Sequence, residues 1–209
     1  MAKKETIKNI YFVGGSPCAG KSTICEIISQ KYDLYYFKVD AYLDDYMKIA
    51  VERKEPLCTK NMQMSQEEIW MRDPLIQTKE EFGIYEEIFL NILDDLKKIK
   101  SDKAIITEGC AYVPNLLKQL RIPNSKYIAI VPTKEFQVSH YEKRNYVPLM
   151  LKECSDKETA FQNWMERDAL FAKEVAKQCK DNDCKLIVND GTIDVNDLVA
   201  EVVNHFEIK

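Results

Sequence analysis

Residues 10–23 read IYFVGGSPCAGKST. Residues 15–22 match the pattern G-x-x-x-x-G-K-[ST], with an apolar run directly before them and a helical pattern over residues 21–31 directly after. In a strand, loop and helix of this kind, the loop N–H groups converge on phosphate oxygens and the helix start adds its positive dipole. The stretch therefore predicts a phosphate-binding loop.

The loop also predicts its ligands. Lys21 is expected to neutralise the β and γ phosphates of ATP, and Ser22 to ligate Mg²⁺. A dinucleotide site is excluded because G-x-G-x-x-G is absent here. Guanine specificity is disfavoured. The [NT]-K-x-D element of GTP-binding proteins recognises guanine through its Asp, and residues 133–136 have Phe136 at that position. The expected cofactor-binding residues of the loop are Gly15, Ser16, Pro17, Cys18, Ala19, Gly20, Lys21, Ser22 and Thr23.

Five β-type runs alternate with helical segments. They lie at residues 10–13, 35–39, 104–107, 127–131 and 186–188. Their continuous apolar character is typical of strands covered on both faces, as in a parallel sheet. The pattern predicts a single α/β domain over residues 1–209, of the three-layer α/β/α P-loop NTPase fold. We expect a central five-stranded parallel sheet and a helical insertion at 41–100 after the second strand.

Helix starts are predicted from Ser or Thr followed three residues later by Glu, the capping-box spacing. An apolar stripe at spacings of three and four indicates one core-facing helix over residues 80–100. Pro74 is expected to end the short helix that starts after Ser65. The three capping pairs are Thr78 with Glu81, Ser155 with Glu158, and Ser65 with Glu68.

Composition narrows the function classes. A net charge of −4 carries no basic footprint, so nucleic acid is an unlikely partner. Seven scattered cysteines without Cys-x-x-Cys pairs indicate free thiols. No apolar stretch approaches the ~20 residues that span a bilayer, and no secretory signal precedes the first strand. We therefore expect a cytoplasmic protein without a membrane partner. A homodimer stays open.

The chain resembles the P-loop small-molecule kinases that phosphorylate nucleosides, nucleotides, shikimate, gluconate and chloramphenicol. The resemblance rests on residues 10–23, on YYFKVDAY at 35–42, and on Glu108-Gly109. It implies that Asp40, closing the second strand, faces the acceptor hydroxyl and takes its proton, or holds a water of Mg²⁺. The alternative is that Asp40 caps a helix near Ala41.

The resemblance implies roles for further acids. Glu108 ends a hydrophobic strand beside the loop and is expected near Mg²⁺ or the acceptor, although a strict Walker B strand ends in Asp. Asp44 and Asp45 are expected on a solvated helix face, and the alternative is a contact with the substrate or the metal. The expected metal site consists of Ser22, Asp40 and Glu108.

The resemblance also implies a basic lid at about 137–160, after the fourth strand, and a loop that packs against the adenine ring. Residues 140–146, HYEKRNY, carry the lid cations, and a guanidinium there would stabilise the transferring phosphoryl group. Arg144 is the first choice and Arg167 the second. Asp190 and Gly191 are expected beside the adenine. The expected catalytic residues are Lys21, Asp40, Arg144 and Arg167.

The insertion is expected to build the pocket for a small-molecule acceptor. Its expected substrate residues, with the acid of the third strand, are Asp40, Tyr42, Arg53, Arg72, Tyr85 and Glu108. A hydroxyl acceptor is favoured because Asp40 offers a base, which predicts an ATP- and Mg²⁺-dependent kinase acting on an alcohol group. Two alternatives stay open: a nucleoside monophosphate kinase, whose phosphate would need cationic clamps, and a non-catalytic ATP-binding regulatory protein.

Overall fold

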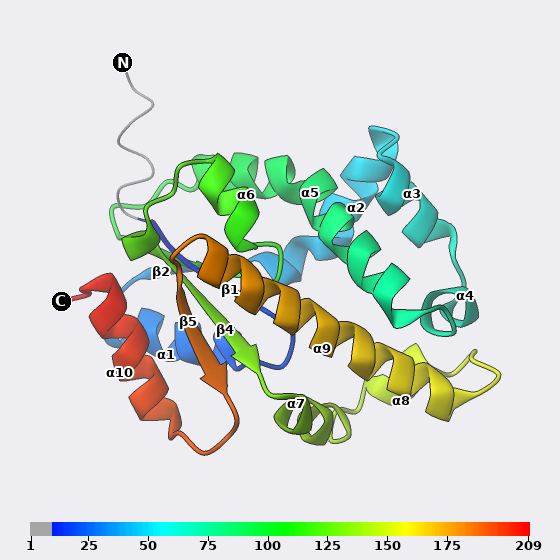
Figure 1. Ribbon diagram of the computed structural model, residues 1–209. Helices are drawn as coiled ribbons and strands as arrows, with labels where there is room; N and C mark the ends of the chain where they lie inside the picture. The colour runs from blue at the N-terminus through cyan, green and yellow to red at the C-terminus, as the bar shows by residue number, and fades with distance from the viewer. Residues whose placement is uncertain (1–9) are drawn as a thin grey trace.

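The computed structural model describes residues 10–209 (Figure 1). Its five strands form one parallel sheet in the order β2-β3-β1-β4-β5, which confirms the predicted sheet. In the register, Val13 of the central strand pairs with Glu108 on one side and Ile128 on the other. The strands are β1 (Ile10–Gly15), β2 (Tyr35–Lys38), β3 (Ile105–Glu108), β4 (Tyr127–Pro132) and β5 (Lys185–Asn189).

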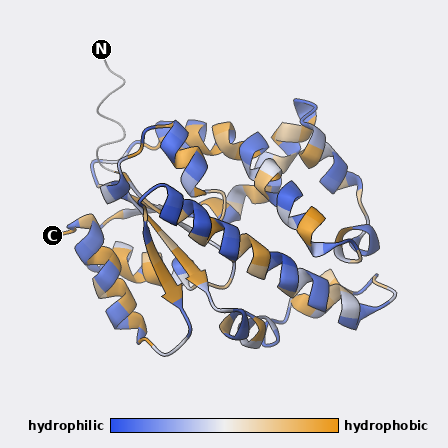
Figure 2. Cartoon of the chain, in the orientation of Figure 1, coloured by the Kyte–Doolittle hydropathy of each residue, from blue (hydrophilic) through white to orange (hydrophobic). Residues whose placement is uncertain are grey.

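Helices cover both faces of the sheet, as the continuous apolar strands predicted. On one face, α1 (Lys21–Lys31) and α10 (Val195–Phe206) pack over Val13 and its neighbours. On the other, α5 (Pro74–Lys98), α6 (Pro114–Gln119) and α9 (Lys157–Asp181) bury Phe12 and its neighbours. Figure 2 shows the hydrophobic strands between helices whose outer surfaces are hydrophilic. The result is the predicted three-layer α/β/α arrangement.

Most of the insertion after β2 is helical. A 3₁₀ turn, η1 (Val39–Tyr42), leads into α2 (Leu43–Glu52), α3 (Pro56–Gln63), α4 (Gln66–Trp70) and then α5. In Figure 1 these helices lie together on the side of the molecule opposite α10. Tyr85, Phe89, Ile92 and Leu96 of the predicted apolar stripe are buried, so α5 faces the core as expected.

The segment after β4 forms a second helical region. The short helix η2 (Asn124–Lys126) precedes β4, while α7 (Lys134–Tyr141) and α8 (Val147–Met150) follow it and lead into α9. The amino-terminal half of α9 packs in a small apolar cluster with Trp70 of the insertion. Its carboxyl-terminal half packs in the main core through Phe171 and Val175. A single 25-residue helix therefore connects this region to the sheet.

Only one of the three predicted capping boxes is correct. Ser65 and Glu68 form a reciprocal box at the start of α4. At α5, Asp73 accepts from the N–H groups of Leu75 and Ile76, so Pro74 begins this helix instead of ending α4, and Thr78 lies inside it. Pro fits the first helical position because its missing N–H would be unpaired there.

At α9 the observed N-cap residue, Asp156, lies one residue after the predicted one, Ser155. Asp156 accepts from the N–H groups of Glu158 and Thr159. Ser155 instead donates through its N–H and its hydroxyl to Glu67 of α4, at 2.7 Å each. The contact ties the segment before α9 to the insertion.

All seven cysteines are free thiols, as predicted. Across residues 10–209, no helix has the length and apolar character needed to cross a membrane.

Candidate active site

The phosphate loop occupies the turn between β1 and α1. Gly15 has a φ of 125°, and a Cβ there would lie 1.8 Å from the carbonyl oxygen of Ile130, so only glycine fits. Gly20 has a φ of 88° and Cys18 one of 59°. No side chain caps the first turn of α1, which leaves its N–H groups free to meet an anion.

Lys21 lies at the floor of this loop. Its side chain is buried, and Nζ donates to the carbonyl oxygen of Ser16 at 2.6 Å and to Sγ of Cys110 at 3.4 Å. Burial alone would lower the pKa of the ammonium, but three nearby acidic groups outweigh burial and hold that pKa above its ordinary value. These groups belong to Cys110, Glu108 and Asp40. The lysine therefore remains charged and available to a polyphosphate.

Glu108 faces the first turn of α1 from the end of β3. Its side chain is fully buried, and Oε1 accepts from the Ser22 hydroxyl and from the Tyr36 phenol, both at 3.0 Å. Oε2 has no hydrogen-bond partner among residues 10–209. Burial and the charge of Glu108 raise the pKa of Tyr36 well above its ordinary value, so this phenol stays a donor.

These oxygens form a donor set that suits Mg²⁺. The ion prefers hard oxygen ligands and uses one or two protein groups together with phosphate and water. A serine hydroxyl and a carboxylate with one unsatisfied oxygen meet that requirement. Within the described chain, no group of three or more His, Cys, Asp and Glu side chains offers a different metal site.

Asp40 lies in η1, directly after β2, and is exposed to solvent. No side-chain hydrogen bond caps η1 or α2, so the alternative role of Asp40 as a helix cap has no support. Its charge contributes to the raised pKa values of Lys21 and Tyr85. The carboxylate therefore lies within electrostatic reach of both the phosphate loop and the insertion.

A cavity of about 340 Å³ lies beside the phosphate loop. It is formed by the loop, by α7 and by the segment between β5 and α10. Gly191 lines it with a φ of 83°, and a Cβ there would lie 2.6 Å from the Phe136 ring. Asp190 is exposed and turned into its own loop, where its carboxylate accepts from the N–H and hydroxyl of Thr192.

Arg144 also lines this cavity, beyond the end of α7. Its guanidinium lies 5.3 Å from the centre of the Tyr141 ring, and Nη1 donates to the Tyr146 hydroxyl at 2.9 Å. The side chain is exposed and lines the same cavity as Cys18 of the phosphate loop. Its positive charge partly offsets the larger effect of burial, which raises the pKa of the Cys18 thiol. Of the two candidate lid arginines, Arg144 is the one that the structure brings to the loop.

Arg167 lies in a different setting from the one predicted. Its guanidinium pairs with Asp168 at 2.5 Å and with Glu81 at 3.1 Å, and lies 5.0 Å from the Trp70 ring. Asp168 is fully buried and also accepts from the Tyr141 phenol at 2.7 Å. Arg167 is therefore part of a buried ion-pair network between α5 and α9, not a free lid cation.

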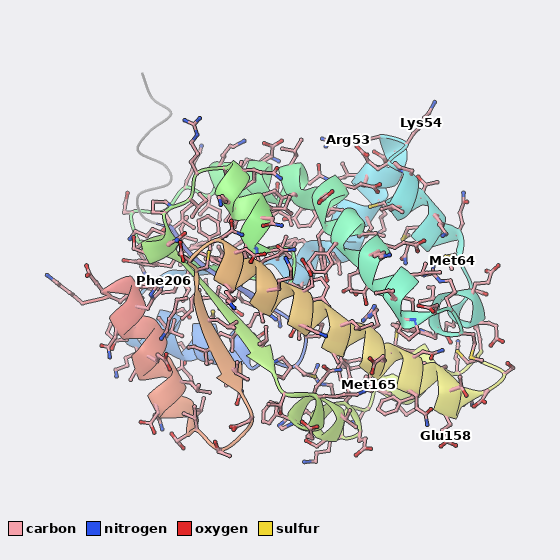
Figure 3. All side chains as sticks on the ribbon, in the orientation of Figure 1. Arg53, Lys54, Met64, Glu158, Met165 and Phe206 are labelled. Carbon is pink, nitrogen blue, oxygen red and sulfur yellow. The ribbon has the colours of Figure 1, made fainter. Side chains whose placement is uncertain are left out.

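A second cavity, of about 320 Å³, lies between the insertion and the lid. Arg72 and Tyr85 of the insertion line it together with Arg167, and their role toward a substrate stays a prediction. Two other predicted substrate residues lie elsewhere. Tyr42 stacks on Phe37 at 5.3 Å near the β2 edge. Arg53 donates to Asn91 at 2.7 Å, and Figure 3 shows it at the outer turn between α2 and α3.

The Cys110 thiol, beside Lys21, is affected by charges from both Glu81 and Asp40. Glu81 lines the second cavity, and its charge, like that of Asp40, raises the pKa of the Cys110 thiol after the larger effect of burial. The same thiol lies 3.4 Å from Nζ of Lys21. The first cavity lies at the carboxyl end of the sheet, where open α/β sheets bind ligands, because the loop after β1 and Asn189 at the end of β5 line it.

Several residues of the site were not predicted from the sequence. Asn189 at the end of β5 donates through Nδ2 to the carbonyl oxygen of Ala19 and accepts from the Gly191 N–H, which ties the phosphate loop to the loop after β5. Tyr36 holds Glu108, and Phe136 lines the first cavity. Asn189 and Tyr36 carry no motif, because their roles depend on which strands become neighbours.

Comparison with known proteins bears on the fold. No protein-family model and no curated protein matches the sequence. Among solved structures, the chain is similar to shikimate kinase from Bacteroides thetaiotaomicron, with a TM-score of 0.58, 13% identity, and coverage of 95% of this chain and 98% of that one. It is also similar to TT1252 from Thermus thermophilus, with a TM-score of 0.51, 14% identity, and coverage of 93% and 95%. The chain has the fold of the P-loop small-molecule kinases.

Proposed function

We propose that this chain is an ATP- and Mg²⁺-dependent phosphotransferase that moves the γ-phosphoryl group onto a hydroxyl of a small molecule, such as a nucleoside, a metabolite or an antibiotic-like compound. One observation carries the proposal. Lys21 and Ser22 follow a loop whose first residue, Gly15, has no room for a Cβ. The Ser22 hydroxyl donates to the buried carboxylate of Glu108, whose other oxygen has no hydrogen-bond partner among residues 10–209. A lysine, a hydroxyl and a carboxylate in this arrangement are the groups that bind a polyphosphate and its metal ion in P-loop proteins.

In this proposal the phosphate side binds and orients ATP. The N–H groups of the loop and of α1 surround the phosphate oxygens, and the Lys21 ammonium neutralises charge on the β and γ phosphates. Ser22 and Glu108 would hold Mg²⁺, which supplies further charge neutralisation at the phosphates when bound. The first cavity takes the nucleoside, and Arg144 approaches the phosphates from the lid.

The acceptor would enter the second cavity and present its hydroxyl to Asp40. The hydroxyl oxygen forms a bond to the γ-phosphorus, and the bond from that phosphorus to the β,γ-bridging oxygen breaks, leaving its electron pair on ADP. The hydroxyl proton passes to the Asp40 carboxylate. Asp40 is exposed, so its carboxylate can approach a substrate in the crevice, as a general base must.

Site-directed variants test the chemistry. ADP formation should depend on an added hydroxyl acceptor, and both Lys21→Ala and Asp40→Ala should abolish it. Only Lys21→Ala should greatly weaken ATP binding, because Asp40 acts on the acceptor. Full activity of Asp40→Ala would remove the base assignment. Tight ATP binding without acceptor-dependent ADP release, across a broad acceptor panel, would instead favour a regulatory ATP-binding protein.

A further inference from the structure

The second cavity, which we call the acceptor cavity, has an uneven distribution of charge. Its charged side chains come from α2, α5, the middle of α9 and the segment between α4 and α5. The volume, about 320 Å³, is at the lower end of the roughly 300–1,000 Å³ usual for small-molecule sites. The charged side chains that line it are Asp44, Arg72, Glu80, Glu81 and Arg167.

Both arginines of this cavity already have carboxylate partners. Arg72 pairs with Glu80 at 2.5 Å and also donates to the carbonyl oxygen of Ile69. Arg167 lies between Glu81 and Asp168. These side chains are 0–21% exposed, so an anion that drew either arginine away would leave a poorly solvated carboxylate behind. The cavity therefore offers no free cationic clamp for a phosphate or carboxylate of the acceptor.

The charge that remains available is negative. Asp44 is exposed at the start of α2, lines the cavity, and has no hydrogen-bond or ion-pair partner among the residues described. Its neighbour Asp45 differs, because it pairs with Lys48 at 3.2 Å and does not line the cavity. Asp40, the proposed base, lies in η1 directly before α2, and its negative charge adds to the larger effect of burial in raising the pKa of Glu81.

The wall also contains polar atoms that lack partners. Trp70 and Gln77 line the cavity and are more than nine-tenths buried. Nε1 of Trp70 and Oε1 of Gln77 have no hydrogen bond within residues 10–209. Buried polar groups are normally paired, and protein covers both atoms, so the hydroxyl groups of a ligand would supply the missing partners only after these side chains turn toward the cavity.

Resting on the proposed phosphotransferase function, we propose that the acceptor is a compact, hydroxyl-rich molecule with a protonated amine, of the amino-sugar or amino-alcohol type, whose ammonium pairs with Asp44. One hydroxyl is directed to Asp40 and receives the phosphoryl group, with the proton passing to Asp40 and ADP leaving as above. The engaged arginines disfavour nucleoside monophosphates and sugar acids.

Tryptophan fluorescence offers a direct binding test, because one of the two tryptophans of the chain lines this cavity and the other stacks on the first. Trp70 lines it, and Trp164 stacks on Trp70 at 4.4 Å. The full chain, with Mg²⁺ and a non-hydrolysable ATP analogue, would be titrated with glucosamine, glucose and glucuronate, which share one ring, and separately with ethanolamine and AMP. Glucosamine should bind about tenfold more tightly than glucose, and the two anions should give no saturable change.

Two neighbouring variants assign the amine preference to one carboxylate. Asp44→Asn should reduce glucosamine binding to the level of glucose, whereas the matched control Asp45→Asn should retain the preference. Tighter binding of glucuronate or AMP would overturn the proposal, as would an amine preference that survives Asp44→Asn, or no saturable change with either amine.

Enzyme assays separate failure of this proposal from failure of the proposed function. Acceptor-dependent ADP formation with a neutral or anionic alcohol would overturn the amine inference while supporting the phosphotransferase. Loss of nucleotide binding altogether would remove both.

Discussion

The phosphate side and the acceptor side of the crevice use their charges in opposite ways. On the phosphate side, Lys21 is held by a backbone carbonyl and a thiol, and Glu108 by two hydroxyl groups, with no ion pair to either within residues 10–209. On the acceptor side, Arg72 and Arg167 each lie in ion pairs. The first arrangement keeps charge available for a ligand, and the second uses charge to join the insertion to α9.

The comparison leads to a clear division of effects. Removing a charge on the phosphate side should reduce function and leave stability nearly unchanged. Removing Arg72 or Arg167 on the acceptor side should reduce the free energy of unfolding, because a poorly solvated carboxylate would lose its counter-ion.

The largest effect is expected for Lys21→Ala. The variant should lower kcat/KM for ATP by at least about 10³-fold, because it removes the charge that faces the β and γ phosphates. Its melting temperature should remain close to that of the parent. Steady-state kinetics and calorimetric unfolding measure the two quantities. Lys31→Ala, at the exposed end of the same helix, is the control. A large loss of stability in Lys21→Ala would contradict the division.

Next in size is the effect of Arg167→Leu. Without the guanidinium, Glu81 and the fully buried Asp168 lose their counter-ion, which should cost about 3–5 kcal/mol of unfolding free energy. Denaturant titration measures this loss. The control is Lys134→Ala, which breaks an exposed pair with Glu166 and should cost less than about 1 kcal/mol. Equal effects of the two variants would show that the Arg167 network does not hold the regions together.

A smaller effect, dependent on pH, is expected at Glu80. Although burial opposes it, hydrogen bonds and charges from Lys60 and Arg72 lower the pKa of this carboxyl. A lowered pKa means that the contribution to stability is present above the ordinary pKa of about 4.3 and is lost as the pH falls through the folded-state value. The parent should therefore be more stable than Glu80→Gln at pH 7, and the difference should shrink toward pH 3. A pH-independent difference would contradict this account.

The smallest effect is expected where the lid side meets the insertion. Ser155→Ala removes the hydroxyl contact with Glu67 but keeps the backbone contact. Hydrogen exchange in α8 and in the loop before α9 should become modestly faster, with no change at the phosphate loop. Thr159→Ala, which removes a bond local to the α9 cap, serves as the control. Faster exchange at the phosphate loop would show that the two sides are not independent.

The same contrast explains what the sequence could predict. The phosphate side depends on neighbours in the chain, so the loop glycines, Lys21 and Ser22 form a recognisable motif, and the buried strands reveal the parallel sheet. Glu108 could be predicted as part of the metal site because it ends a hydrophobic strand, β3, beside the phosphate loop. Its role with Mg²⁺ stays a prediction, as do those of Asp40 and Arg144.

The acceptor side depends on contacts between residues far apart in the chain. Arg167 pairs with Glu81 of α5, and Ser155 with Glu67 of α4. The resemblance that suggested Arg167 as a lid cation, and the spacing that suggested two capping boxes, were therefore misleading. Arg53 and Tyr42 have suitable chemistry for a substrate, but neither lines the acceptor cavity, because Arg53 bonds Asn91 and Tyr42 stacks on Phe37. Local spacing does not contain that information.

Calorimetric titration of the chain with ATP in the presence of Mg²⁺ tests the central claim most directly. The account predicts saturable uptake of one nucleotide per chain, dependent on Mg²⁺ and lost in Lys21→Ala but not in Lys31→Ala. Absence of nucleotide uptake by the parent chain, or equal uptake by Lys21→Ala, would contradict it.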